Sequence, residues 1–154
     1  MTKISELETK SNREEYFVEY KDIVSEYEEY LDPPETIYDY YTDAELDLLF
    51  RVVQAEIGDY SFNQKCNVVS VILNRIDDSR FPNTMSGVLV PNQFSTISNG
   101  RIYNVTVDES TILACEYVFM FGDTTGGALF FDSNGALNYK FLFNDGAHNF
   151  YSTY

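Results

Sequence analysis

Glu56 is the residue of this sequence best placed to act as an acid. It lies near the end of a predicted apolar helix, between Ala55 and Ile57, and the turn Gly58-Asp59 follows it. The carbonyl end of a helix carries partial negative charge, and apolar neighbours disfavour ionisation, so both raise the pKa of a carboxyl group there. A carboxylic acid that keeps its proton near neutral pH can protonate a glycosidic oxygen. The alternative interpretation is a surface glutamate near a helix end.

Other catalytic arrangements have weaker support. The sequence contains no glycine-rich phosphate loop, no HExxH motif and no GxSxG motif. Its single histidine, His148, could pair with Cys66 or Cys115, but both cysteines lie on apolar faces of predicted helices, where a low thiol pKa is not expected. One histidine cannot complete a Cys/His zinc set, so we predict no metal and no cofactor. We expect two buried free thiols, with a disulfide as the alternative.

Capping signals and hydrophobic spacing predict the elements that position Glu56. Two capping boxes, Thr42 with Glu45 and Ser61 with Gln64, each open a helix. The predicted helices cover about residues 42–57, 61–77, 84–89 and 109–121. Residues 91–100 are expected to form a loop, and the aromatic runs at 128–131 and 149–152 favour strands. We therefore predict a mainly helical α+β domain with a small C-terminal sheet or hairpin.

The first 41 residues differ from the main body at 42–154. Residues 1–40 carry 12 acidic and 4 basic residues, whereas the other 114 carry 13 and 6. An apolar stripe predicts an acidic amphipathic helix over about 13–31, followed by an extended linker at 35–41. The stripe consists of Phe17, Tyr20, Val24, Tyr27 and Leu31. Two interpretations stay open: the helix packs on the main domain, or it docks on another protein, such as part of a larger particle.

Composition limits the classes of partner. A chain of 154 residues with 44% hydrophobic residues fits one packed domain. The net charge of −15 argues against a direct nucleic-acid binder and against attachment to anionic lipid through a basic face. No run of about 18 uncharged apolar residues predicts a membrane span. The N-terminus lacks the apolar core of a signal peptide, so we expect a protein that starts in the cytoplasm.

Six short motifs, in order, resemble those of the SleB/CwlJ-type cell-wall hydrolases. The motifs are VVQAEIGD at 52–59, NVVSVILNR at 67–75, FPNT at 81–84, QFS at 93–95, GALFF at 127–131 and HNFY at 148–151. Together they cover about residues 46–152 and leave residues 1–41 outside the resemblance. The resemblance implies a lysozyme-like fold that acts on the glycan strands of peptidoglycan.

The resemblance also implies roles for particular residues. Glu56 would protonate the oxygen between MurNAc and GlcNAc, and would then act as the base while the C6 hydroxyl closes a 1,6-anhydro ring. This lytic transglycosylase route needs one carboxylate, whereas hydrolysis by a muramidase uses two. The residues expected to bind substrate are Gln93, Phe94, Ser95, Tyr60 and Tyr103. The residues expected to support the site are Asn74, Arg75, His148 and Tyr151.

Purely structural roles stay open as alternatives for several of these residues. Asn74 and Arg75 could cap a helix end and form a surface ion pair, and Phe94 could be a core residue. For His148 a structural role is favoured over a catalytic one. A hydrolytic mechanism would recruit a second carboxylate, for which the candidates are Asp59, Asp132 and Asp145.

Charge raises the question of delivery. A protein with a net charge of −15 is repelled by an anionic wall, so we expect a phage or phage-tail-like particle to carry it, with residues 1–40 as the docking segment. Spore association and release by a holin are the alternatives. The sequence departs from the family pattern at Asp59 and Asn63, among others, so a second functional interpretation is an inactive structural or adaptor protein that retains the fold. The sequence leaves open whether wall or spore cortex is the substrate, and the oligomeric state.

Overall fold

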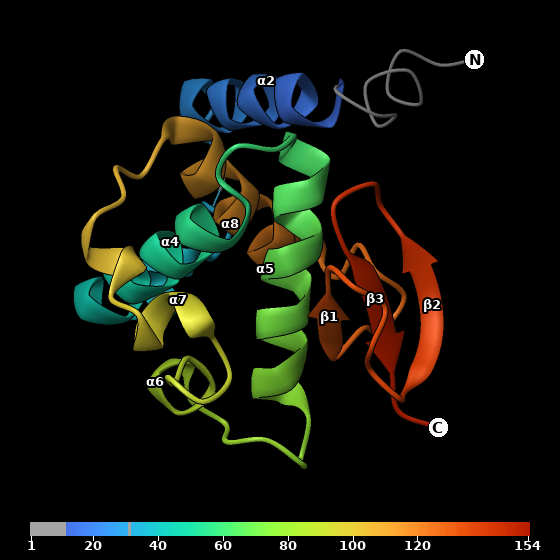
Figure 1. Cartoon of the computed structure of the whole chain (residues 1–154). Helices are drawn as coiled ribbons and strands as arrows, with labels where there is room; N and C mark the ends of the chain where they lie inside the picture. Colours follow the sequence, from blue (N-terminus) through green and yellow to red (C-terminus); the bar gives the residue numbers. More distant parts are fainter. Residues whose placement is uncertain (1–11, 31) are drawn as a thin grey trace.

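Helices form one side of the molecule and a small antiparallel sheet forms the other (Figure 1). The computed structural model describes residues 12–30 and 32–154. The helices are α2 (Asn12–Glu26), α3 (Ile37–Tyr40), α4 (Asp43–Ile57), α5 (Phe62–Asp77), α6 (Met85–Val88), α7 (Ser95–Ser98), the 3-10 turn η1 (Arg101–Tyr103) and α8 (Glu109–Phe121). The strands are β1 (Phe130–Asp132), β2 (Lys140–Asn144) and β3 (Asn149–Ser152). The predicted mainly helical α+β class is confirmed.

Both predicted capping boxes are present. The backbone amide of Thr42 donates to Glu45 Oε1 at 2.9 Å, and the Glu45 amide donates to Thr42 Oγ1 at 3.2 Å. Ser61 and Gln64 exchange the equivalent bonds at 3.0 and 3.2 Å. Each box satisfies amides that a helix start leaves unpaired, and so fixes the residue at which the helix begins. The start of α4 at Asp43 places Glu56 in its last turn.

Helix α5 separates the helical layer from the sheet. One side of it packs on α4 and α8, where Val69 and Cys66 join the main hydrophobic core. Its other side carries Val71, which forms a second apolar cluster with Ala128 and Phe150 from the sheet region. Because α5 is covered on both sides, it is a rigid wall from which polar side chains of its last turn can reach β1.

In the described part of the chain the strands form a three-stranded antiparallel sheet in the order β1-β3-β2. Phe131 pairs with Phe150, so β1 is held beside β3. The predicted strands at 128–131 and 149–152 are present, with β1 shifted to Phe130–Asp132. The prediction missed β2, an edge strand whose pairing shifts between Phe141 and Phe143, so its side chains show no regular alternation.

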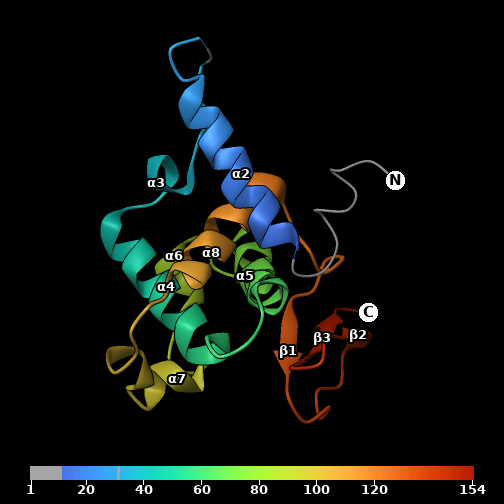
Figure 2. The same ribbon diagram turned by 90° about the horizontal axis from the view of Figure 1, so that it is seen from above.

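Helix α2 packs on the main body, across α8 (Figure 2). Phe17 is 1% exposed and meets the rings of Tyr117 and Phe121 edge-on, at centroid distances of 5.5 and 5.9 Å. Lys21 Nζ forms an ion pair with Glu116 at 2.8 Å. The inner face of α2 therefore packs on the main domain, as one of the two interpretations expected.

Two predictions about the segment before α4 are wrong. Helix α2 ends at Glu26 instead of residue 31, and Tyr27 is 48% exposed; Leu31 lies outside the described residues. The segment 35–41 is not an extended linker, because α3 begins there with a capping box between Thr36 and Asp39. Ile37 is 1% exposed, so its burial in the main core favours this turn.

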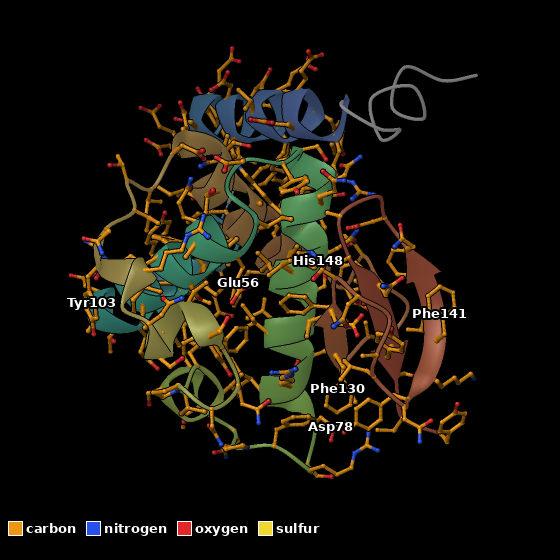
Figure 3. The ribbon with its side chains drawn as sticks, viewed as in Figure 1. Glu56, Asp78, Tyr103, Phe130, Phe141 and His148 are labelled. Atoms are coloured by element: carbon orange, nitrogen blue, oxygen red, sulfur yellow. The ribbon has the colours of Figure 1, made fainter. Side chains whose placement is uncertain are left out.

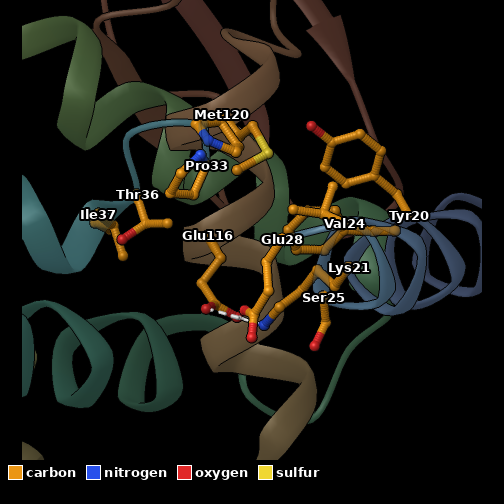
Figure 4. Close-up of a pocket in the computed structure, with 12 residues that line it drawn as sticks. Tyr20, Lys21, Val24, Ser25, Glu28, Pro33, Thr36, Ile37, Glu116 and Met120 are labelled. Carbon is orange, nitrogen blue, oxygen red and sulfur yellow. Dashed lines mark hydrogen bonds and ion pairs between the residues drawn. The ribbon is translucent and has the colours of Figure 1, made fainter. Parts of the chain in front are cut away.

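A hollow of about 210 Å³ lies between α2, α8 and the segment that joins α2 to α3 (Figure 4). Its walls are mostly apolar and include Tyr20, Val24, Pro33, Ile37 and Met120. The Lys21–Glu116 ion pair belongs to the same lining. The N-terminal segment is therefore joined to the body by apolar and ionic contacts together.

The expected chemistry of the cysteines is confirmed. Cys66 and Cys115 are buried and free. Burial raises the pKa of the Cys66 thiol to about 12, and burial also raises the pKa of the Cys115 thiol well above its ordinary value. Neither is therefore a reactive thiolate near neutral pH. Within the described residues, no His, Cys, Asp and Glu cluster could hold a metal ion, and no helix is long and apolar enough to cross a membrane.

Candidate active site

A cleft of about 270 Å³ brings together residues from both sides of the molecule. Its lining consists of Glu56, Arg75, Gln93, Phe94, Ser95, Phe131, Asp132, Ser133, Asn134 and His148. Glu56 lies in the last turn of α4, and His148 immediately precedes β3 (Figure 3). The expected acid therefore lies around one cavity with residues 93–95, Arg75 and His148, all of which were expected to bind substrate or support the site.

The Glu56 carboxyl group has one hydrogen bond within the described residues. Thr96 Oγ1 donates to Glu56 Oε1 at 2.9 Å. Burial raises the pKa of Glu56 above its ordinary value, although the Thr96 hydrogen bond and the positive charge of Arg101 oppose this rise. A carboxyl group with a raised pKa holds its proton to higher pH and can act as a general acid.

Arg75 joins α5 to the strand side of the cleft. Its Nε donates to the Leu129 carbonyl oxygen at 2.7 Å, and its guanidinium carbon lies 5.4–5.5 Å from the ring centroids of Phe81, Phe94 and Phe130. Burial lowers the pKa of Arg75 to about 10, so the side chain stays charged at neutral pH. The aromatic faces and the carbonyl group compensate a cation that is 5% exposed.

Asn74 makes the parallel contact one residue earlier. Its Nδ2 donates to the Ala128 carbonyl oxygen at 3.0 Å. Asn74 and Arg75 thus tie the last turn of α5 to the residues just before β1. Because β1 carries Phe131 and Asp132 into the cleft, these two bonds set the position of one wall. Among the described residues, Arg75 forms no surface ion pair of the kind considered as its alternative role.

Asp132, which also lines the cleft, is an anchor for the loop that follows β1. Its two oxygens accept hydrogen bonds from Tyr151 Oη at 2.9 Å, from Asn149 Nδ2, and from the backbone amides of residues 135, 136 and 137. Burial raises the pKa of Asp132, but the bonds from Tyr151 and the amides outweigh it and lower the pKa below its ordinary value. Tyr151 therefore reaches the site through Asp132.

The two other candidate second carboxylates are not in the cleft lining. Asp145 Oδ1 accepts from the amides of Ala147 and His148, both at 2.9 Å, and its Oδ2 accepts from Asn67 Nδ2 at 2.9 Å. Asp145 thus holds the turn before β3. Asp59 is exposed beyond the end of α4. Within the described residues, Glu56 is therefore the carboxyl group of the cleft with the fewest hydrogen bonds to the protein.

His148 lines the cleft with its ring edge-on to Phe131, at a centroid distance of 4.9 Å. Burial lowers the pKa of His148, although Asp145 and Asp132 oppose this shift. The ring therefore stays neutral to lower pH than an ordinary histidine does. Its Nδ1 is buried without a hydrogen-bond partner among the described residues. The side chain therefore contributes a neutral surface and packing to the wall opposite Glu56.

Comparisons with known proteins identify the family of this chain. The family model described as Cell Wall Hydrolase matches residues 60–151. The chain belongs to this family. The match begins four residues after Glu56 and does not include this residue.

Curated relatives of this chain include spore cortex-lytic enzymes. The one from Bacillus cereus is 33% identical over 92 residues, which are 59% of this chain and 35% of the relative. The one from Halalkalibacterium halodurans is 32% identical over 92 residues, which are 59% and 28% of the two chains. The chain thus spans about a third of the length of the curated relatives it matches.

Solved structures of SleB catalytic domains share the fold. The catalytic domain of the germination-specific lytic transglycosylase SleB from Bacillus anthracis matches with a TM-score of 0.67 and 26% identity, over 75% of this chain and all of that chain. The catalytic domain of the Bacillus cereus SleB protein matches with a TM-score of 0.65 and 27% identity, over 73% and 92%. The predicted family and the lysozyme-like fold class are confirmed.

The residues that line the cleft differ in part from the predicted substrate-binding residues. Gln93, Phe94 and Ser95 line it, but Tyr60 and Tyr103 do not, and these two side chains are 54% and 75% exposed. Phe94 is 2% exposed, so it belongs to both the core and the cleft.

Thr96, the hydrogen-bond donor to Glu56, was not among the predicted site residues. Residues 91–100 were expected to be a loop, but they contain α7, which turns Thr96 inward and leaves Ser95 exposed. The signal that could have found it is the pair Ser95-Thr96 directly after Phe94. A threonine next to predicted cleft residues is a candidate because its hydroxyl can donate to a carboxyl group.

Proposed function

We propose that this protein cleaves the glycan strand of peptidoglycan between MurNAc and GlcNAc, as a lytic transglycosylase rather than a hydrolytic muramidase, with Glu56 as both acid and base. The observation that carries the proposal is the contrast between the two carboxyl groups that line the described cleft. Glu56 is partly buried with one hydrogen bond, whereas Asp132 accepts five. A single available carboxyl group suits a reaction that needs one.

The chemistry balances with Glu56 alone. Protonated Glu56 gives its proton to the glycosidic oxygen as the bond from that oxygen to C1 of MurNAc breaks, and GlcNAc leaves with a hydroxyl group. The resulting carboxylate then takes the proton of the MurNAc C6 hydroxyl, while the oxygen of that hydroxyl bonds to C1. The product carries a 1,6-anhydro ring, no water is consumed, and Glu56 returns to its protonated form. The raised pKa of Glu56 favours the first step.

The rest of the cleft supplies groups that suit a sugar. Gln93 and Ser95 are exposed polar side chains on one wall, and Ser133 and Asn134 are exposed on the loop anchored by Asp132. Hydroxyl and amide groups of this kind can bind sugar hydroxyls and N-acetyl groups. We propose that Gln93, Phe94 and Ser95 position the sugar, and that Tyr60 and Tyr103 are candidates for stacking on sugar units outside the cleft.

Digestion of purified peptidoglycan tests the reaction. The wild type, Glu56→Gln and the matched control Glu35→Gln, on an exposed glutamate, are each incubated with vegetative sacculi and with spore cortex, and mass spectrometry identifies the fragments. We expect fragments about 18 Da lighter than hydrolysed muropeptides from the wild type and the control, and none from Glu56→Gln. Fragments with reducing ends would instead indicate a muramidase. No fragments from any of the proteins would favour the inactive structural or adaptor component.

We also propose delivery by a phage or phage-tail-like particle. The net charge of −15 disfavours diffusion to an anionic wall, and a particle would remove the need for it. The outer face of α2 carries two exposed apolar residues, Val18 and Ile23, at 41% and 50% exposure. Such residues on an acidic helix are candidates for a protein contact. Spore association is the alternative supported by the names of the curated relatives.

The delivery proposal is tested on the outer face of α2 and not by removal of residues 1–40. Phe17 and Ile37 belong to the main core, so a deletion would remove part of the fold. A Val18→Ser, Ile23→Ser double variant should lose co-purification with particles and keep its activity on purified peptidoglycan. Unchanged co-purification would contradict docking through this face.

A further inference from the structure

Thr96 meets Glu56 from a different element of the fold. It is the second residue of α7, whereas Glu56 belongs to the last turn of α4, and these two helices are in contact. Thr96 is 6% exposed, and its Oγ1 lies 2.9 Å from Glu56 Oε1. A threonine hydroxyl carries one proton, so when that proton points at Oε1 it is not available to another acceptor.

This contact makes the two oxygens of Glu56 unequal. In a neutral carboxyl group the oxygen without the proton is the better acceptor, so a donor at Oε1 favours the proton on Oε2. Oε2 has no hydrogen bond with any described residue. We propose that Thr96 is a positioning residue for Glu56: its hydroxyl keeps Oε1 as an acceptor and leaves Oε2 as the oxygen that exchanges the proton with the substrate. This inference deepens, and rests on, the proposed role of Glu56.

The same contact serves both halves of the reaction. When Glu56 has given up its proton, the hydrogen bond becomes charge-assisted and stronger, so it stabilises the carboxylate that must act as the base. The positive charge of Arg101 on η1 acts in the same direction. Thr96 therefore limits how far burial can raise the pKa of Glu56. Without it, the pKa of Glu56 would be higher, and the carboxyl group would give its proton less readily to the glycosidic oxygen in the first step.

Other charged or titratable groups around the cleft do not replace this contact. Arg75 from α5 donates to Leu129 and Gln93, and Asp132 from β1 holds its loop. His148, before β3, has a pKa lowered by burial. Among the described residues, none of the three donates to a Glu56 oxygen. Thr96 is thus the side chain that can determine which oxygen of Glu56 carries the proton.

The test compares Thr96→Val, which removes the donor at nearly constant shape, with Thr96→Ser, which keeps it. Thr106→Val, on an exposed threonine, is the matched control, and Thr96→Ala repeats the loss of the donor if valine does not fold. Carbon NMR of the Glu56 carboxyl group is recorded against pH in the protein without substrate. The resonance is assigned by its absence in Glu56→Gln. Rates on purified peptidoglycan are then measured over the same pH range.

We expect Thr96→Val to move the Glu56 titration to higher pH and to lower kcat about tenfold, with little change in KM. Thr96→Ser and Thr106→Val should match the wild type in both measurements. A Thr96→Val titration curve that superimposes on the wild type, or an equal loss in Thr96→Ser, would overturn the inference. The titration needs no activity, so it tests the contact even if Glu56→Gln were fully active, which would instead refute the proposed function.

Discussion

At the scale of the residue, Glu56 is partly buried and its charge has little compensation from the protein. Burial raises its pKa, and it has one hydrogen bond from the described residues to compensate its charge. The folded protein therefore binds this proton more tightly than the unfolded chain does. The stability that the protonated form contributes is lost as pH rises from the ordinary glutamate range through the raised pKa of the folded state. Active sites often carry such a cost.

Glu56→Gln should consequently raise the thermal stability of the protein, and the gain should increase with pH. A neutral amide carries no desolvated charge, and its oxygen can still accept from Thr96. The measurement is the melting temperature of the wild type and Glu56→Gln at about pH 4 and about pH 8. Glu35→Gln serves as the exposed control. A gain of equal size at both pH values would contradict the sign derived from burial.

Asp132 shows the opposite behaviour, because its charge is well compensated. Its pKa lies below the ordinary value, and its oxygens hold the loop from Gly135 to Leu137. Asp132→Asn should lower the free energy of unfolding by about 1–2 kcal/mol, because an amide nitrogen replaces one acceptor of backbone amides. Chemical denaturation measures this loss. Activity should fall with the 1,6-anhydro product unchanged; a switch of product would mean that Asp132 takes part in the reaction.

At the scale of the element, the cleft depends on how α5 is fastened to β1. Asn74 and Arg75 both donate to backbone carbonyls just before the strand, and the Arg75 guanidinium lies against three aromatic rings. An arginine suits this position because its planar fork can donate and stack at once. Strand β1 is short, so this anchoring, with the pairing to β3, sets where Phe131 and Asp132 lie.

Arg75→Lys should therefore lower the free energy of unfolding by about 2–3 kcal/mol, because lysine keeps the charge but loses the stacked, directed donor. It should also raise KM, since one wall of the cleft becomes less fixed. Denaturant unfolding and steady-state rates measure the two effects. Arg80→Lys, at an exposed ion pair with Asp78, is the matched control and should change both far less. Equal effects of the two substitutions would contradict the anchoring role.

At the scale of the whole molecule, the N-terminal segment is part of the fold even though the matched family range begins later. Phe17 and Ile37 lie in the main core, and α2 contacts α5 and α8. The predicted division at residues 41 and 42 remains a prediction about function. The inner face of α2 packs on the domain, and the proposed partner would contact its outer face.

Phe17→Ala should lower the free energy of unfolding by about 3–5 kcal/mol, because it removes a fully buried ring from an aromatic cluster. Val18→Ala, at the neighbouring exposed position, should change it by less than about 0.5 kcal/mol. Urea unfolding of both variants gives the comparison. A small effect of Phe17→Ala would mean that α2 is an attachment that the domain does not need.

Much of the architecture could be predicted because its signals are local. Thr42 with Glu45 and Ser61 with Gln64 fix helix starts through bonds between residues three apart, so α4 and α5 were predicted within a residue. The position of Glu56 at the end of an apolar helix was visible in the same way. The shorter turns were harder: α3 and α7 form where Ile37 and Thr96 are buried by distant parts of the chain.

The sequence by itself determined the long helices α4, α5 and α8, the family pattern and the identity of the candidate acid, because periodicity and capping depend on neighbours along the chain. Only the tertiary structure decided which groups meet that acid. Thr96 reaches Glu56 across 40 positions, and Tyr151 reaches Asp132 across 19. Whether Asp132 was an available second carboxylate also depended on bonds from β3 and from its own loop. Contacts of this kind are set by packing between elements, and no local pattern specifies them.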